Sequence, residues 1–382
     1  MAQQNGKVLV VGAGVTGAVL SHLLQDARVA LKHVPEVVVW EKNNIAGGRM
    51  MARSFHKNRT VHVDIGAQYL TKFAAANDDI RSLLTQKCKL VPFDESTIAQ
   101  DAYHQARRAD GETGKPVLEH VVCPDALGFR SMVQELLQDT PTVLSQEVER
   151  FEILNESQIK VTSTDGTETI VNDLVLTCPV PNVLSILEKS TTFTGASPAQ
   201  LDALKAVRYS QRFALAYLFD AGIAKQVQAL GWTSKYISKD EDDIVRYLCW
   251  DNLKKQPSTG FDSAHFSLLV HTSVPFGVKH MDTKQQNDEI LAIVTESVKK
   301  LLPFLPAQED VILHRWRISQ VAKPYVESPD QSSPVGAIML NELPRIVVAG
   351  DAFLGSTFDN CLLSAKSAAD IIIKDATISS GL

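Results

Sequence analysis

KVLVVGAGVTG, residues 7–17, is the stretch that decides the fold. Val8–Val11 is wholly apolar and mostly β-branched, which is the composition of a strand buried on both faces. Gly12, Gly14 and Gly17 follow in the order G-x-G-x-x-G. The first allows a tight turn, the second lets a pyrophosphate approach the backbone, and the third lets a helix pack against the strand.

The surrounding sequence supports a dinucleotide-binding function. Residues 15–26 suit a helix, whose N-terminal amides, that of Thr16 included, face the phosphates. A second apolar strand, Val37–Trp40, ends in Glu41, which places a carboxylate where such folds bind a ribose hydroxyl. An acid at this point, in place of an arginine, argues against a 2′-phosphate on this nucleotide. The alternative interpretation is a glycine-rich turn without function.

Composition and charge limit the class of protein. The chain has 382 residues, of which 45% are apolar and 21% charged, with a formal net charge of −6. This balance excludes the basic surface that a nucleic-acid partner requires, and the length suits two interleaved domains. Five cysteines without C-x-x-C spacing predict neither a disulfide framework nor a metal site. No apolar run is long enough to span a bilayer, and no obligate protein partner is evident.

Signals for export or for an organelle are weak. Lys7 followed by an apolar stretch mimics a secretory signal, but its removal would delete the first strand and the phosphate turn. The chain ends in Ser380-Gly381-Leu382, which is similar to a peroxisomal tripeptide except that glycine replaces lysine. We therefore expect a cytoplasmic protein in a reducing compartment, with secretion by a route without a cleaved signal as the alternative.

Two further segments predict contacts with the nucleotide. Glu41 is followed by Lys42 and then by a loop in which Gly48 precedes Arg49, whose guanidinium is suited to bidentate contact with phosphate oxygens. The alternative is a surface arginine on a flexible loop. The stretch VDIGAQY, residues 63–69, contains three adjacent candidates for contact with the cofactor, which are Gly66, Ala67 and Gln68. The first two are small and let the backbone come against a flat ring.

These segments together resemble the FAD-binding head of the flavin amine oxidase superfamily, since plain nicotinamide dehydrogenases lack the GGR loop. The resemblance implies an α/β fold with a Rossmann-type FAD-binding domain and an interleaved, sheet-based substrate domain. It also implies that the backbone around Val148, in a predicted strand over residues 146–153, holds the adenine end of FAD. We place the FAD-binding domain at 1–78, 121–196 and 307–382, and the substrate domain at 79–120 and 197–306.

The C-terminal region resembles the second dinucleotide motif of that superfamily. A buried strand over residues 345–349 ends in Gly350 and Asp351, and the family's aspartate binds near the ribityl chain and the pyrophosphate. The helix predicted from about Asn360 directs its positive end at the flavin, which stabilises negative charge on the reduced ring. Cys361 invites a covalent link to FAD, but the cysteine-linked members use a different motif. We therefore expect non-covalent FAD, and the alternative for this region is a simple terminal strand–helix pair.

Five strings outside the general FAD motifs resemble one subgroup of the superfamily: TCPVP (177–181), VRYSQRFAL (207–215), VHTSVPFGV (270–278), WRISQV (316–321) and FDNC (358–361). This resemblance implies an FAD-dependent oxidase of misreduced nicotinamides, the isomers of β-NAD(P)H that carry the added hydride at ring position two or six. The products are NAD(P)⁺ and hydrogen peroxide, and dioxygen is the acceptor.

A dihydropyridine is electron-rich, so loss of hydride needs positioning and exclusion of water more than a general base. Such a site is apolar and aromatic, with few polar anchors. The catalytic candidates are His271 and Trp316, for contact and stacking, and Arg317 and Arg246, for a carboxamide or phosphate. A core histidine is the alternative for the first of these. The subgroup often has a histidine where this chain has Ile318, which leaves substrate preference open.

Two other functions remain open from the sequence. A flavin amine oxidase acting on a polyamine or a monoamine needs an aromatic cage, and the chain has seven tyrosines and four tryptophans to build one. We find no clear counterpart of the lysine that many such enzymes place near the flavin. A protein of another class would keep FAD as a structural core and act in signalling without turnover.

Overall fold

The computed structural model describes residues 6–31, 34–72, 84–86, 88–99, 119–256, 260, 263–283, 286–328 and 334–378. The chain forms two compact units, each built from separate segments. The first unit comprises Met1–Arg49, Val133–Tyr209 and Gln320–Leu382, and the second comprises Met50–Met132 and Ser210–Ser319. The predicted α/β fold with two interleaved, sheet-based parts is confirmed.

These units differ from the domain boundaries expected from the sequence. Residues 50–72 belong to the second unit, where β3 (Ala52–Ser54) pairs with β4 (His62–Asp64) and β5 (Leu70–Lys72) pairs with β8 (Glu119–Val122). Residues 307–319 also belong there, because β19 (Asp310–Trp316) is an edge strand of its large sheet. The segment 197–209 belongs to the first unit, which it joins through β14 (Arg208–Tyr209).

The first unit is organised around a six-stranded sheet in the order β21-β22-β13-β1-β2-β9. All neighbours are parallel except β21, which runs antiparallel to β22. The strands are β1 (Lys7–Val11), β2 (Glu36–Trp40), β9 (Thr142–Val143), β13 (Asp173–Leu176), β21 (Ala337–Asn341) and β22 (Ile346–Ala349). Because β1 and β22 are parallel to β13 between them, the glycine-rich turn and the Gly-Asp motif follow strands that end at one edge of the sheet.

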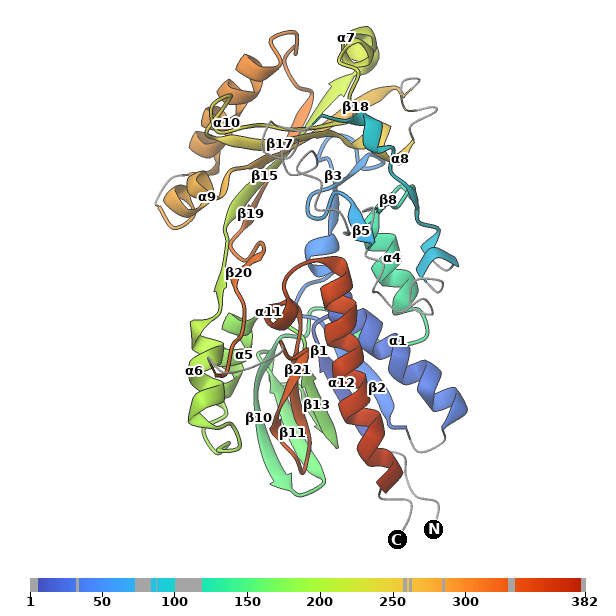
Figure 1. Ribbon diagram of the computed structural model, residues 1–382, viewed down its shortest axis with the longest axis vertical. Helices are drawn as coiled ribbons and strands as arrows, with labels where there is room; N and C mark the ends of the chain where they lie inside the picture. Colours follow the sequence, from blue (N-terminus) through green and yellow to red (C-terminus); the bar gives the residue numbers. More distant parts are fainter. Residues whose placement is uncertain are drawn as a thin grey trace, which may run out of the picture. The chain divides into compact units, whose positions relative to one another are not determined.

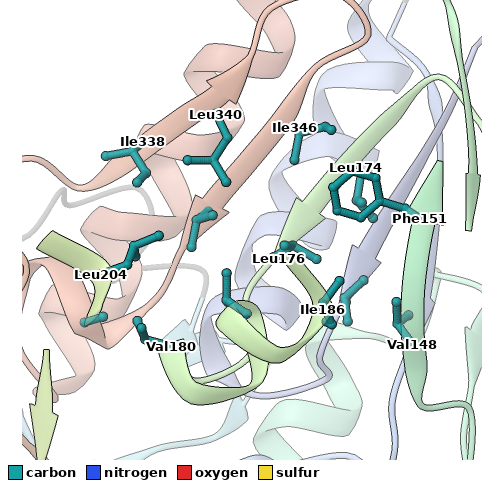
Figure 2. Close-up of a cluster of buried hydrophobic side chains, with 14 of the residues drawn as sticks. Val148, Phe151, Leu174, Leu176, Val180, Ile186, Leu204, Ile338, Leu340 and Ile346 are labelled. Carbon is teal, nitrogen blue, oxygen red and sulfur yellow. The ribbon is translucent and has the colours of Figure 1, made fainter. Parts of the chain in front are cut away.

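Alternate residues of these strands face two different layers. Helices α1 (Val15–Ala30) and α12 (Phe358–Ile378) lie side by side against the sheet, drawn in blue and red in Figure 1. Leu9 and Val11 face the other way, into a core shared with the antiparallel sheet β10-β11-β12 and with α5 (Val180–Lys189), part of which Figure 2 shows. The bounds of that sheet are β10 (Val148–Asn155), β11 (Gln158–Ser163) and β12 (Glu168–Val171).

The second unit has its own six-stranded sheet, in the order β19-β15-β18-β17-β16-β7. Its strands are antiparallel except for the edge pair β16–β7. One face packs on α10 (Asn287–Leu301), and the other packs on Phe55, Val63 and Ile65. The remaining bounds are β15 (Arg212–Asp220), β18 (His265–Thr272), β17 (Val245–Trp250), β16 (Ser234–Tyr236) and β7 (Ile98–Ala99).

Smaller elements complete both units. α6 (Pro198–Ala206) and β20 (Val321–Lys323) belong to the first, and β6 (Val91–Pro92), α7 (Ala224–Ala229), α8 (Asp251–Lys255) and α9 (Val274–His280) to the second, while α4 (Phe129–Leu136) crosses the boundary. Most of the predicted insertion at 79–120 lies outside the described residues. None of the helices in the described part of the chain is long and apolar enough to cross a membrane.

Candidate active site

The glycine-rich turn after β1 has the geometry that a bound pyrophosphate requires. Gly12 adopts a φ of +110°, which only glycine tolerates well. A Cβ on Gly17 would lie 2.0 Å from the carbonyl oxygen of Gly12, so only glycine lets α1 pack this closely. By contrast, a Cβ on Gly14 would meet no atom within 4 Å. The backbone at Gly14 therefore faces open space at the start of α1, where the phosphates of a dinucleotide fit.

The Glu41 carboxylate is buried and held beside this turn. Its Oε2 accepts the backbone N–H of Ala13 at 2.8 Å, and its Oε1 accepts the side-chain amide of Asn43 at 2.6 Å. Oε1 also accepts the backbone N–H of Asn43 at 2.9 Å, so both of its lone pairs are used, and one lone pair of Oε2 remains for a ribose hydroxyl. Lys42 is exposed. Burial raises the pKa of the Cys178 thiol to about 12, and the positive charge of Lys42 opposes part of this increase.

The loop containing Gly48 and Arg49 lies directly against the glycine-rich turn. Gly47 donates its N–H to the carbonyl of Ala13 at 2.9 Å. Gly48 has a φ of +53°, and a Cβ there would lie 3.2 Å from the Cα of Gly14. The backbone itself therefore forms the surface beside the phosphate turn, and a larger residue at Gly48 would move it.

Arg49 joins the N-terminal motif to the C-terminal one. Its Nη1 donates to Oδ2 of Asp351 at 2.6 Å, although the two residues are 302 positions apart in the sequence. Burial lowers the pKa of Arg49, but the carboxylate of Asp351 more than offsets this and raises it above its ordinary value. Asp351 follows Gly350, whose φ of +138° favours glycine, and also accepts the hydroxyl of Ser356 at 2.5 Å. Both predicted dinucleotide motifs thus meet within the first unit.

The start of α12 belongs to the same group of residues. Burial and Asp351 raise the pKa of the Cys361 thiol to about 12, while Arg49 and a hydrogen bond with Thr16 lower it. The sulfur is therefore a neutral thiol at pH 7 and a poor nucleophile, as expected for FAD that is not covalently attached. Asn360 donates its side-chain amide to the carbonyl of Leu354 at 2.5 Å, and so fixes the turn that leads into α12.

Val148 begins β10 and is buried in the core of the first unit (Figure 2). Two residues earlier, Gln146 donates its backbone N–H to the carbonyl of Glu41 at 2.8 Å. The chain leading into β10 therefore runs beside the ribose acid. The structure brings Val148 to the neighbourhood in which the sequence places the adenine end.

The segment Gly66–Gln68 lies in the second unit and is held from the inside. Gln68 donates its side-chain amide to the carbonyl of Asp64 at 2.6 Å and to that of Gly66 at 3.1 Å. Its Oε1 accepts from Lys254 at 3.3 Å. The buried Gln68 side chain thus fixes the backbone of Gly66 and Ala67, a supporting role that the sequence did not indicate.

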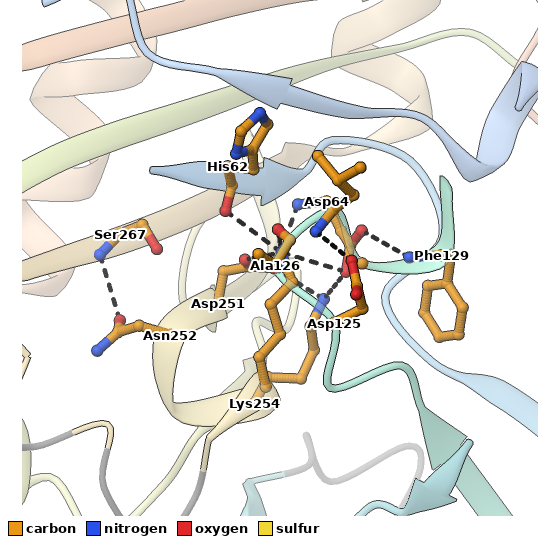
Figure 3. Close-up of polar contacts among 12 residues, drawn as sticks. His62, Asp64, Asp125, Ala126, Phe129, Asp251, Asn252, Lys254 and Ser267 are labelled. Atoms are coloured by element: carbon orange, nitrogen blue, oxygen red, sulfur yellow. Dashed lines mark hydrogen bonds and ion pairs between the residues drawn. The ribbon is translucent and has the colours of Figure 1, made fainter. Parts of the chain in front are cut away.

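Lys254 is the centre of a buried ionic group (Figure 3). Its ammonium lies 2.8 Å from Asp64 and 2.8 Å from Asp251, and the side chains of all three residues are at most 1% exposed. Lys255 lies 2.8 Å from Asp251. Burial raises the pKa of Asp251, but the two ammonium groups outweigh it and lower that pKa to about 2. Asp64 also accepts the N–H of Phe129 at 3.2 Å, so this group ties three separate segments of the second unit together.

One face of the second sheet carries a row of aromatic residues. Tyr236 pairs with Tyr247, Tyr247 with His271, His271 with Ala214, and Ala214 with His314, so their side chains share one face. The ring centroids of Tyr236 and Tyr247 are 4.9 Å apart, and those of Tyr247 and His271 are 6.1 Å apart. We define the aromatic face as these residues together with Trp316, whose ring lies 4.3 Å from that of His314.

His271 and Trp316 hold the same backbone atom. Nε2 of His271 lies 3.1 Å from the carbonyl oxygen of Ile65, and Nε1 of Trp316 donates to that oxygen at 3.1 Å. A carbonyl only accepts, so Nε2 of His271 carries the proton and Nδ1 is an acceptor. Burial lowers the pKa of His271 to about 4, so the ring is neutral at pH 7. The segment entering Gly66 is therefore tied to the aromatic face.

The two predicted arginines occupy different places. Arg317 is 58% exposed and forms an ion pair with Asp282, so it does not join His271 and Trp316. Strand alternation explains this, because the residue after Trp316 points away from the aromatic face. Arg246 donates to the carbonyl of Ile237 and places its guanidinium 5.7 Å from the centre of the Tyr236 ring.

Sequence reasoning missed four residues of this face, which are Tyr69, Arg212, Tyr236 and Tyr247. The hydroxyl groups of Tyr69 and Tyr236 form a hydrogen bond, Tyr236 pairs with Tyr247, and Arg212 pairs with Trp316. Their strands could be predicted, but the register that aligns them depends on pairing between distant segments. Two signals were available: Tyr69 ends the predicted motif at 63–69, and Arg212 lies in the string at 207–215.

Comparison with known proteins identifies the class. Residues 118–373 match the flavin containing amine oxidoreductases, and residues 10–86 match an NAD(P)-binding Rossmann-like domain. The chain belongs to the flavin containing amine oxidoreductase family and is an FAD-dependent oxidoreductase. It is 27% identical to renalase from Mus musculus over 370 residues, which cover 96% of this chain and 98% of renalase. The subgroup predicted from the five strings is renalase, and this renalase-like character is confirmed.

Solved structures support the fold. An Exiguobacterium protein described as a protoporphyrinogen oxidase has a TM-score of 0.68 at 12% identity, over 98% of this chain and 100% of that one. A putrescine oxidase redesigned in cofactor binding has a TM-score of 0.64 at 12% identity, over 97% of this chain and 99% of that one. At such identities the similarity shows the architecture alone.

Proposed function

We propose that this protein is an FAD-dependent oxidase of isomeric dihydronicotinamide dinucleotides. It takes hydride from the 2- or 6-dihydro forms of β-NAD(P)H and yields NAD(P)⁺ and hydrogen peroxide. The similarity to renalase along nearly the whole chain supports this proposal. Cytoplasmic location belongs to the same proposal, because all five cysteines are free thiols and suit a reducing compartment.

The observation that carries the proposal is the charge around His271. Its imidazole is neutral, and the nearby guanidinium of Arg212, which acts on it, is positive, whereas the ammonium of Lys254 is held between Asp64 and Asp251. An amine substrate binds as an ammonium ion or must lose a proton on binding. A positive charge opposes binding of the ammonium ion, and the neutral ring of His271 is a weak base for removal of the proton. A dihydronicotinamide has a neutral ring and anionic phosphates, which suit this face.

The residues of the first unit that would hold FAD are Gly14 for the pyrophosphate, Glu41 for the ribose, and the pair of Arg49 and Asp351 near the ribityl chain. FAD held there would supply the hydride acceptor and the means of reducing dioxygen. The structural fit rests on the open space at Gly14 and the remaining lone pair of Glu41 Oε2.

The aromatic face would position the substrate. Trp316, which is partly exposed, offers apolar surface for a flat ring and excludes water from it, while the buried Tyr247 packs beside His271. Nδ1 of His271 is an acceptor and suits the N–H₂ of the nicotinamide carboxamide. No proton has to leave the ring carbon, so the neutral His271 orients the ring and does not act as a base.

Anaerobic rapid mixing tests the proposal. Isomeric dihydronicotinamide dinucleotides should bleach the flavin band quickly, while ordinary 4-dihydro NADH, putrescine and a catecholamine should not. Bleaching by amines alone would establish the amine oxidase alternative. A yellow protein that no reductant bleaches above background would favour a binding protein without turnover.

A further inference from the structure

The hairpin of β3 and β4 runs beside the edge strand β19 of the large sheet. At one end, the backbone N–H of Lys57 donates to the carboxylate of Asp310 at 2.7 Å. At the other end, the carbonyl of Ile65 accepts from the indole of Trp316 at 3.1 Å, and the N–H of Ile65 donates to Met51 at 3.1 Å. The segments 51–57 and 310–316 therefore run in opposite directions and are equally long, which brings position 53 level with position 314.

Arg53 projects from this hairpin towards the large sheet. It pairs with Val63, and residues that are direct partners on neighbouring strands share a face. Val63 belongs to the same hydrophobic cluster as Phe55 and Ile312, so this face of the hairpin packs on β19. Phe55 is two residues from Arg53 and projects to the same side of the extended chain. The guanidinium of Arg53 is therefore directed towards His314.

His314 is a half-buried residue of the aromatic face, and its ring centroid lies 4.3 Å from that of Trp316. Within the described ranges of the chain, its ring forms no hydrogen bond. Burial lowers the pKa of His314 to about 4, and the positive charge of Arg53 contributes to this decrease. The ring is therefore neutral at pH 7, with one N–H donor and one acceptor that a ligand can use.

Arg53 is also half-buried, and among the residues that the structure describes it has no carboxylate partner and no hydrogen bond. A charge that is partly removed from water is costly unless an anion compensates it. A phosphate suits this position, because its oxygens accept paired N–H donors from a guanidinium. The neutral imidazole of His314 can donate its single N–H to another oxygen of the same phosphate.

We propose that Arg53 and His314 form a phosphate subsite for the nicotinamide dinucleotide, at the phosphate nearest the nicotinamide ribose. This inference rests on the proposed function, in which Trp316 offers its surface to the nicotinamide ring. His314 precedes Trp316 by two residues on β19, and their side chains are in contact. A phosphate on the nicotinamide ribose is one sugar away from the nicotinamide ring, which agrees with these neighbouring positions.

Binding of oxidised ligands to the FAD-loaded protein tests the subsite, with calorimetry as the readout. Nicotinamide riboside lacks the phosphate, nicotinamide mononucleotide carries it, and NAD⁺ and NADP⁺ extend it. The wild-type protein should bind the mononucleotide on the order of 10- to 100-fold more tightly than the riboside. Arg53→Gln should remove most of this difference and leave the riboside dissociation constant unchanged.

The histidine is tested by two substitutions. His314→Ala should weaken binding of the mononucleotide by about 3- to 10-fold, because one hydrogen bond to a phosphate oxygen is lost. His314→Gln should restore most of that affinity, since its amide also donates an N–H. Weak binding in both variants would show that the ring acts by packing and would overturn its role as a donor.

Arg59→Gln is the matched control, because it removes a guanidinium from an exposed position in the turn between β3 and β4. Equal loss of riboside and mononucleotide affinity in Arg53→Gln would overturn the subsite. So would a loss confined to NADP⁺, which would assign Arg53 to the 2′-phosphate, or a fall in FAD content, which would assign it to the cofactor. A wild-type protein that binds neither NAD⁺ nor the mononucleotide would overturn the proposed function as well.

Discussion

Replacement of Lys254 by Met tests whether the buried ionic group stabilises the second unit. The ammonium contacts two carboxylates at 2.8 Å, and its side chain is 0% exposed. Lys254→Met keeps much of the apolar volume but leaves Asp64 and Asp251 with one fewer positive partner. Removing one member of a buried pair costs about 3–5 kcal/mol, because an uncompensated charge remains in a low-dielectric interior.

Urea unfolding followed by tryptophan emission measures this cost. Three of the four tryptophans, Trp232, Trp250 and Trp316, belong to the second unit, so emission reports mainly on it. Lys235→Met is the control, since Lys235 and its partner Glu241 are 32% and 37% exposed. Such a pair contributes less than about 1 kcal/mol.

A double variant separates charge from packing. Lys254→Met combined with Asp64→Asn should recover part of the loss, because the second change removes one of the unpaired charges. A cost for Lys254→Met below about 1 kcal/mol would refute the reasoning. A double variant whose loss equals the sum of the single losses would also refute it, since independent effects add.

Four further predictions follow from the described contacts. Gly14→Glu should give folded but colourless protein, because the side chain enters open space where the pyrophosphate fits; a yellow product contradicts the cofactor assignment. Arg49→Gln should reduce FAD retention on gel filtration, since Asp351 loses its cation, and retention equal to wild type argues against the pair. His271→Ala should slow anaerobic flavin reduction while FAD stays bound. Because its pKa of about 4 lies below the ordinary 6.5, this ring gives the wild-type rate no pH dependence between about pH 5.5 and 8. A change of slope in the pH–rate profile within this range that disappears in the variant contradicts the neutral role. Asp251, with a folded pKa of about 2 against 3.8, contributes stability above about pH 4 that is lost as the pH falls towards 2; a flat unfolding midpoint across this window contradicts it.

The dinucleotide half could be predicted from the sequence because its signals are local. The strand before Gly12 and the helix after Gly14 follow from apolar runs and glycine spacing, and the structure has them as β1 and α1. The contact between Arg49 and Asp351 was not predicted, although both residues were singled out. It depends on the order of strands in the sheet, which brings the two ends of the chain to one edge.

The second unit was less readable because its face is made by register. The apolar runs at 213–219, 244–250 and 266–272 are typical of strands, and the structure has them as β15, β17 and β18. Which residues share a face depends on pairing, and a slip of one residue moves every side chain to the other face. The same rule explains why Arg317 lies at the surface while its neighbour Trp316 belongs to the aromatic face.

The sign of the charge on the aromatic face gives the strongest physical argument about substrate. With an effective dielectric constant of about 20, a unit charge about 5 Å from one guanidinium interacts by about 3 kcal/mol. An ammonium is disfavoured by that amount and a phosphate charge is favoured by it, and about 3 kcal/mol corresponds to more than about 100-fold in binding. Arg212 lies on this face, where it is the strand partner of Trp316. The guanidinium of Arg212 therefore favours an anionic dinucleotide over a cationic amine.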